Sequence, residues 1–162
     1  MNGLRVWVMV GVTLAAAGFQ GAAPDPWQDF LGTWQGEGRF LGADARAELS
    51  WERVLNQRFV RLTQRITVRR AQAEQTFEGH AYYAAQAEGS GAGTWFDGEG
   101  HVYAITATLT DNMLDARWGP AGATRGRTVY QLTDGALSVV DSAPGRDGTW
   151  FEFGRLSYRR IR

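Results

Sequence analysis

The fold is decided by the stretch Ala45–Glu52, with the sequence ARAELSWE, in which every second residue is apolar. Ala45, Ala47, Leu49 and Trp51 alternate with polar or charged residues. A period of two places successive side chains on opposite faces of a β-strand. We therefore expect a strand with one buried face and one solvated face.

The same alternation continues on both sides of this stretch. In the segment 60–69 the apolar residues alternate with an arginine stripe (Arg61, Arg65 and Arg69), which we expect to form part of a solvated outer wall. Turn signals separate the segments, including Asp97-Gly98 and Asp134-Gly135. The expected strands lie near residues 33–40, 45–54, 57–69, 75–84, 93–96, 101–109, 113–118, 125–132, 136–141 and 149–159.

A series of about ten strands predicts an all-β fold. A short helical turn over Pro26–Leu31 precedes the first strand, and no helix of ten residues is expected after it. Gly89–Gly93 is interpreted as a hairpin connection and not as a phosphate-binding loop, because it opens no helix. We expect an antiparallel up-and-down barrel, since closure removes exposed sheet edges; a Greek-key sandwich is the alternative.

The N-terminal segment Met1–Ala23 has the layout of a secretory signal peptide. A basic residue precedes an apolar run that is too short to span a bilayer, and small residues follow it. Cleavage is possible after Ala17 or after Ala23, and we favour the second. Residues 24–162 then form a single domain, which we expect to be periplasmic or secreted and to keep no stable membrane anchor after processing.

The composition excludes several classes of function. The chain has no cysteine, and all seventeen basic residues are arginine, balanced by seventeen acidic residues. Disulfides, thiolate chemistry and lysine-based mechanisms are therefore excluded. A formal net charge of zero also makes nucleic acid an unexpected partner.

The opening segment Leu31–Gly38, LGTWQGEG, resembles the Gly-x-Trp start of calycin (lipocalin-like) barrels. It is similar also to the Gly-Thr-Trp-x-Gly-x-Gly opening of nitrobindin-type barrels and of a related bacterial domain family of unknown function. The resemblance implies a barrel with a central cavity for a small, often apolar molecule. It also implies that an arginine of the last strand packs across Trp34, for which Arg155, Arg159 and Arg160 are candidates.

The nitrobindin resemblance would imply a haem held by a histidine near the C-terminus. The corresponding segment Gly154–Arg160 contains no histidine, so we expect neither haem nor another cofactor. His101 follows Asp97 and Glu99, but it has no second histidine at ligand spacing. We therefore interpret it as part of an exposed turn and expect no metal site.

The leading hypothesis is an exported barrel that binds a small, mainly apolar ligand and has no catalytic activity. Aromatic side chains line ligand cavities, although they fill barrel cores equally well. The candidate wall or floor residues are Trp34, Trp51, Leu62 and Tyr83.

Two alternatives belong to other classes of function. One is a small-molecule enzyme in which His80 lies in a polar cavity and exchanges protons with Glu78 or Tyr82 on the same strand face. An ordinary exposed strand histidine explains the same residues. The other is an envelope interaction module that uses the arginine stripe or an exposed sheet edge.

Overall fold

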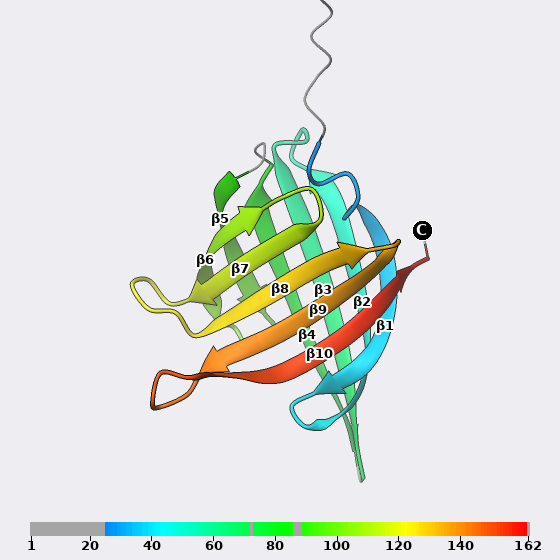
Figure 1. Cartoon of the computed structure of the whole chain (residues 1–162), viewed down its shortest axis with the longest axis vertical. Coiled ribbons are helices and arrows are strands. Elements are labelled where there is room, and N and C mark those ends of the chain that lie inside the picture. Colours follow the sequence, from blue (N-terminus) through cyan, green and yellow to red (C-terminus); the bar gives the residue numbers. More distant parts are fainter. Residues whose placement is uncertain (1–24, 72, 86–88, 162) are drawn as a thin grey trace, which may run out of the picture.

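The computed structural model describes residues 25–71, 73–85 and 89–161. The chain forms a closed antiparallel barrel of ten strands, in which neighbours in sequence are neighbours in space and β1 closes on β10 (Figure 1). This confirms the predicted all-β barrel and rejects the sandwich. The strands are β1 (Gly32–Phe40), β2 (Ala43–Val54), β3 (Phe59–Arg70), β4 (Ala73–Ala84), β5 (Gly89–Asp97), β6 (Val102–Leu109), β7 (Met113–Gly119), β8 (Gly126–Thr133), β9 (Ala136–Pro144) and β10 (Trp150–Arg160).

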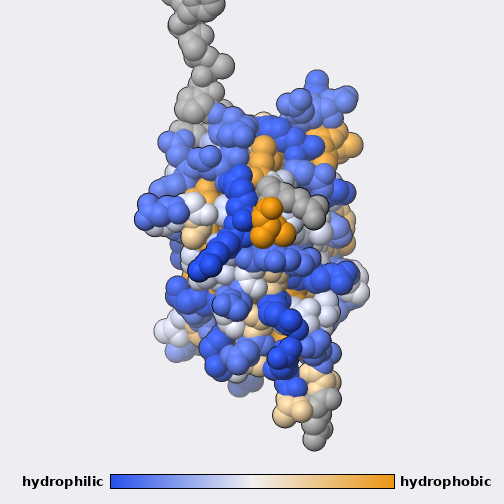
Figure 2. Space-filling view, turned by 90° about the vertical axis from the view of Figure 1, so that its right-hand side faces the viewer, coloured by the Kyte–Doolittle hydropathy of each residue, from blue (hydrophilic) through white to orange (hydrophobic). Residues whose placement is uncertain are grey.

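The alternation in β2 determines which residues face the interior. Ala45, Ala47, Leu49 and Trp51 are buried, whereas the charged residues between them lie on the outer face. The outer surface over β1 and β2 is accordingly mainly hydrophilic, with hydrophobic colour confined to small, separate patches (Figure 2). The predicted signal peptide at residues 1–23 lies outside the described residues.

The described residues contain no helix of the length and apolarity needed to cross a membrane.

The N-terminal turn closes one end of the barrel. No helix forms within the described ranges, and residues 26–30 make a hydrogen-bonded turn in which the amides of Phe30 and Leu31 donate to Trp27 O at 2.9 and 3.2 Å. The rings of Trp27 and Phe30 lie 5.9 and 5.8 Å from Trp51, so they fill this end. The segment is one turn long because β1 begins at Gly32. We call this the closed end.

Trp34 and Arg160 hold the closed end together. Trp34 is fully buried and donates from Nε1 to Phe30 O at 2.9 Å. The guanidinium of Arg160, on the last strand, packs over the Trp34 ring at 4.5 Å and donates to Leu31 O at 2.8 Å. Arg160 is therefore the arginine that the calycin resemblance implied.

The glycine-rich segment Gly89–Gly93 is part of strand β5, so its interpretation as a hairpin was wrong. It pairs residue by residue with Ile105–Leu109 of β6. Small residues suit a strand that is opposed by a larger neighbour, and Gly93 faces Ile105 in the register. Composition alone suggested a turn because glycine is typical of turns and depleted in strands.

Acidic residues neutralise the arginine stripe on the outer face. Arg61 pairs with Glu52 across the β2–β3 ladder, with its Nε 3.0 Å from the carboxylate. Arg65 pairs with Glu78 of β4. The stripe is therefore a ladder of ion pairs on a solvated wall.

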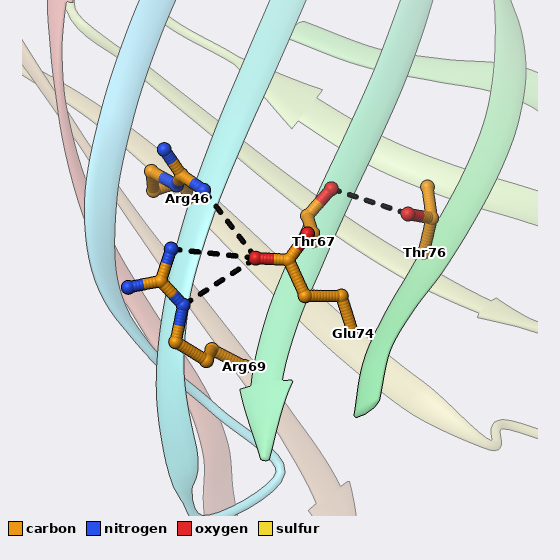
Figure 3. A network of polar contacts seen from close by, with 5 residues as sticks. All are labelled: Arg46, Thr67, Arg69, Glu74 and Thr76. Carbon is orange, nitrogen blue, oxygen red and sulfur yellow. Dashed lines mark hydrogen bonds and ion pairs between the residues drawn. The ribbon is translucent and has the colours of Figure 1, made fainter. Parts of the chain in front are cut away.

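The projecting hairpin of β3 and β4 carries the next ion pairs of this ladder. Figure 3 shows Glu74 of β4 between two arginines, Arg46 of β2 at 3.5 Å and Arg69 of β3 at 3.3 Å. Beside them the hydroxyl groups of Thr67 and Thr76 lie 3.2 Å apart. The contacts are exposed, so each contributes little stability, but they leave little uncompensated positive charge for a partner.

Candidate functional site

The interior of the barrel is hollow toward the end opposite the N-terminal turn, which we call the open end. A cavity of about 550 Å³ lies there, between the walls formed by β3 to β10 and by the end of β1. It reaches the connection between β5 and β6 at Gly98–His101. β4 pairs with β5 only through Gly79–Tyr83, so the first half of β4 projects beyond the barrel wall beside this mouth.

Two tryptophans form flat parts of the cavity wall because each lies against a glycine. A Cβ on Gly79 would lie 2.0 Å from the Trp95 ring, and one on Gly126 would lie 2.1 Å from the Trp118 ring. A larger residue at either position would push the indole into the cavity. Tyr103 continues the aromatic wall, with its ring 5.7 Å from that of Trp118.

A chain of hydrogen bonds runs from the wall to a buried carboxyl group. Trp118 Nε1 donates to Thr128 Oγ1 at 3.1 Å, and Thr128 Oγ1 donates to Asp141 Oδ1 at 2.6 Å. Thr128 and Asp141 are each only 6% exposed. Burial raises the pKa of Asp141 from 3.8 to about 6, against the opposing effect of the Thr128 hydrogen bond.

The second carboxylate oxygen of Asp141 is left without a partner. Within the part of the chain that the structure describes, Oδ2 is buried and accepts no hydrogen bond. A buried acceptor of this kind is costly, and such exceptions are found where a ligand, water or ion completes the site. Asp141 is one of the residues that line the cavity, so a molecule inside it would lie beside this carboxyl group.

Three tyrosines surround the same region. Burial, followed by the negative charge of Asp141, raises the pKa of Tyr83 and of Tyr158, and burial is also the main cause of the raised pKa of Tyr130. Tyr83 and Tyr130 line the cavity. The tyrosines therefore remain neutral hydroxyl groups at physiological pH.

The connection between β5 and β6 at the mouth of the cavity is acidic and forms a tight turn. Asp97 accepts hydrogen bonds from the backbone amides of His101 and Glu99 at 2.9 and 3.0 Å, and His101 Nδ1 lies 3.1 Å from its other oxygen. Burial acts to raise the pKa of Asp97, but these hydrogen bonds outweigh it and lower the pKa. The His101 ring stacks on Tyr103 at 5.6 Å, so His101 forms part of the rim.

The predicted binding residues are divided between the core and the cavity. Trp34, Trp51, Leu62 and Tyr83 are all buried, but of these four only Tyr83 lines the cavity. Trp51 lies directly behind the lining, with its ring 5.9 Å from Tyr83 and 5.2 Å from Tyr130. Trp34 and Leu62 belong to the packed core. Ligand contact by these residues stays a prediction.

His80 lies on the outer face of the barrel, as expected for an ordinary exposed strand histidine and not as the enzyme alternative requires. The residues of β4 that are buried toward the interior are Gly79, Ala81 and Tyr83, and the intervening His80 is exposed. Its Nδ1 lies 3.3 Å from Thr63 Oγ1 on the neighbouring strand. The sequence pattern grouped the right residues on one face, and the structure places that face outside the barrel.

The donor set of the cavity does not fit a histidine-ligated haem. His80 is on the outer surface, and His101 is held at the rim by Asp97. Among the described residues, no group of three or more histidine, aspartate or glutamate side chains is arranged to hold a metal ion. The expectation that the protein uses no cofactor stays a prediction.

Sequence reasoning missed the polar centre of the cavity, although one signal was present. The inward positions of β9 are Leu137, Val139 and Asp141, so a carboxyl group interrupts an apolar series. A charged residue at a buried strand position is a marker of function. The contact of Asp141 with Thr128 could not be read in the same way, because it depends on the β8–β9 register.

Comparison with known proteins supports the fold. No protein-family model matches the chain, and no curated protein sequence matches it. The crystal structure of Rv2717c from M. tuberculosis is similar, with a TM-score of 0.61 and 14% sequence identity over 83% of this chain and 94% of that one. The likeness establishes a shared β-barrel architecture, which is compatible with ligand binding.

Proposed function

We propose that this protein is an exported, calycin-like barrel that binds a small, mainly apolar molecule in its interior. The observation that carries the proposal is the cavity of about 550 Å³. Ligand sites typically occupy roughly 300–1,000 Å³ and combine apolar walls with a few polar groups. Trp95 and Trp118 supply such walls here, and Asp141 is the buried polar group.

The other parts of the proposal have separate support. Export is supported by the predicted signal peptide at residues 1–23, and the calycin-like assignment by the Gly-Thr-Trp opening together with the packing of Arg160 over Trp34. A binding role without catalysis is favoured because His80, the proposed acid–base group, is on the outer face. An interaction module is disfavoured because acidic residues pair with the arginine stripe.

Native mass spectrometry tests the proposal directly. The protein is purified from the compartment into which its host exports it, and its native mass is compared with its denatured mass. We expect a discrete additional mass that denaturation removes, and no Soret absorbance. A bare native mass at every protein concentration would contradict the binding proposal.

A matched pair of variants locates the ligand. Ala116 lines the cavity and is buried, whereas Ala104 is exposed on the outer face of the adjacent strand β6. We expect Ala116→Phe to fill part of the cavity and remove the additional mass, and Ala104→Phe to retain it. Equal retention by both variants would place the ligand outside the barrel.

A further inference from the structure

The cavity is lined by acidic residues and, among the described lining residues, by no arginine. The carboxyl-bearing residues are Glu78, Asp97, Glu99 and Asp141, and the charge of Glu78 is paired with Arg65 on the outer wall. The chain nevertheless contains seventeen basic residues, all arginine. Several of these are paired on the outer wall, as Arg61 is with Glu52. A cleft lined by one sign of charge attracts ligands of the opposite sign.

Asp141 is the most buried of these carboxylates, and one of its oxygens has no hydrogen-bond partner in the described part of the chain. Asp141 Oδ1 is occupied by the Thr128 hydroxyl, whereas Oδ2 is buried without a partner in the described part of the chain. The residue opposite Asp141 on β10 is Gly154, and a Cβ there would lie 3.0 Å from Oδ2. The same Cβ would lie 2.8 Å from the Phe40 ring, so glycine allows β10 to pack closely against this carboxyl group.

Aromatic side chains line the same cavity. Trp95, Tyr103 and Trp118 are lining residues together with the carboxylates of the rim and Asp141. The faces of aromatic rings attract cations, most strongly where water is excluded. The same rings provide apolar area for the body of a ligand.

Resting on the proposed function, we propose that the ligand is a small organic amine, whose ammonium group donates to Asp141 Oδ2 and whose apolar body packs against Trp95 and Trp118. The rim residues Asp97 and Glu99 favour entry of a cation. An anionic ligand would meet the carboxylates of Asp97, Glu99 and Asp141 and no arginine side chain on the described cavity wall, so it is rejected. A neutral alcohol would fit and could donate a hydrogen bond to the carboxylate, but it would lack the attraction between opposite charges.

The pairing depends on pH because burial raises the pKa of Asp141 to about 6. Asp141 is ionised at pH 7.5 and largely protonated at pH 5, so amine binding weakens as the pH falls. The titratable groups that act on it within the barrel are tyrosines, which stay neutral over this range, and those at the rim are Glu78, Asp97, Glu99 and His101. Asp97 keeps its charge because its pKa is lowered.

Isothermal titration calorimetry of the purified protein with ligands matched in shape tests the proposal. The probes are octylamine, 1-octanol and octanoate, and 2-phenylethylamine, 2-phenylethanol and 3-phenylpropanoate. At pH 7.5 we expect each amine to bind about tenfold or more tightly than its alcohol, and each carboxylate to bind most weakly. At pH 5 the advantage of the amine over the alcohol should largely disappear.

A variant pair assigns the effect to one carboxylate. Asp141→Asn keeps the shape of the side chain and removes its charge, so it should abolish the preference for amines and leave the affinity for alcohols within about threefold. Asp111→Asn makes the same change on the exposed β6–β7 turn and should keep the preference. If Asp141→Asn does not fold, the loss of preference between pH 7.5 and pH 5 in the unaltered protein decides the question.

The outcomes separate this inference from the proposed function. Alcohols or carboxylates that bind as tightly as the amines would overturn the amine assignment while the binding function stands. Failure of all six probes to bind would overturn both. A preference for amines that survives both Asp141→Asn and low pH would also overturn the role of Asp141.

Discussion

Replacing Asp141 with asparagine should change how the stability of the protein depends on pH. Asp141 is buried, and its pKa is raised from 3.8 to about 6 mainly by burial. The folded state therefore binds the proton of this carboxyl group more tightly than the unfolded state does. The contribution of Asp141 to stability is complete below about pH 4 and is lost as the pH rises through about 6.

The magnitude follows from the two pKa values. The interval between 3.8 and about 6 corresponds to at most about 3 kcal/mol of unfolding free energy, since one pH unit corresponds to about 1.4 kcal/mol. Asparagine does not ionise, so the unfolding free energy of Asp141→Asn relative to the wild type should increase by up to about 3 kcal/mol between pH 4 and pH 7.5.

Urea unfolding followed by tryptophan fluorescence measures this difference. Both proteins are unfolded at several pH values between 4 and 8, and the difference in unfolding free energy is plotted against pH. The asparagine carries a pH-independent cost, because its amide introduces an unpaired donor, but this cost shifts the curve without changing its slope. Asp111→Asn is the control and should follow the wild type within about 0.5 kcal/mol. A flat difference between Asp141→Asn and the wild type would refute the reasoning.

Two further substitutions test contacts described above. Thr128→Val removes the hydroxyl that donates to Asp141. Because that hydrogen bond lowers the pKa of Asp141, the midpoint of the pH dependence of stability should move to higher pH. Urea unfolding at pH 7.5 should show that the unfolding free energy falls by about 2 kcal/mol. An unchanged midpoint would contradict this role of the hydroxyl. Arg160→Ala removes the guanidinium over Trp34 and should cost about 1–2 kcal/mol in the same assay, whereas Arg159→Ala on the exposed face should cost less than about 0.5 kcal/mol. Equal losses for the two arginines would show that the contact with Trp34 contributes nothing.

The strands could be predicted from the sequence because their evidence is local. In β2 the alternation of Ala45–Glu52 marks both the strand and its buried face without knowledge of any neighbour. The failure at Gly89–Gly93 shows the limit of this reasoning. Glycine favours a turn locally, and only the pairing with Ile105–Leu109 of β6 makes this segment a strand.

The candidate site was harder to predict. Alternation shows which residues share a face of a strand, but it does not show whether that face points into the barrel or toward solvent. His80 and Tyr82 were correctly placed together, but the burial of Ala81 and Tyr83 turns them outward. Conversely, Trp51 was correctly placed inside the barrel but lies behind the lining tyrosines and not at the cavity surface.

The sequence by itself determined the strand count, the antiparallel class and the chemistry that is absent, because alternation, turn residues and composition are properties of the chain alone. Only the tertiary structure decided that the barrel is hollow at one end and that its cavity contains Asp141. A cavity is the volume that side chains from many strands leave unfilled, and here glycines at 79 and 126 set how far Trp95 and Trp118 reach. The unpaired oxygen of Asp141 likewise depends on the registers of β8 and β10 against β9, which no local pattern specifies.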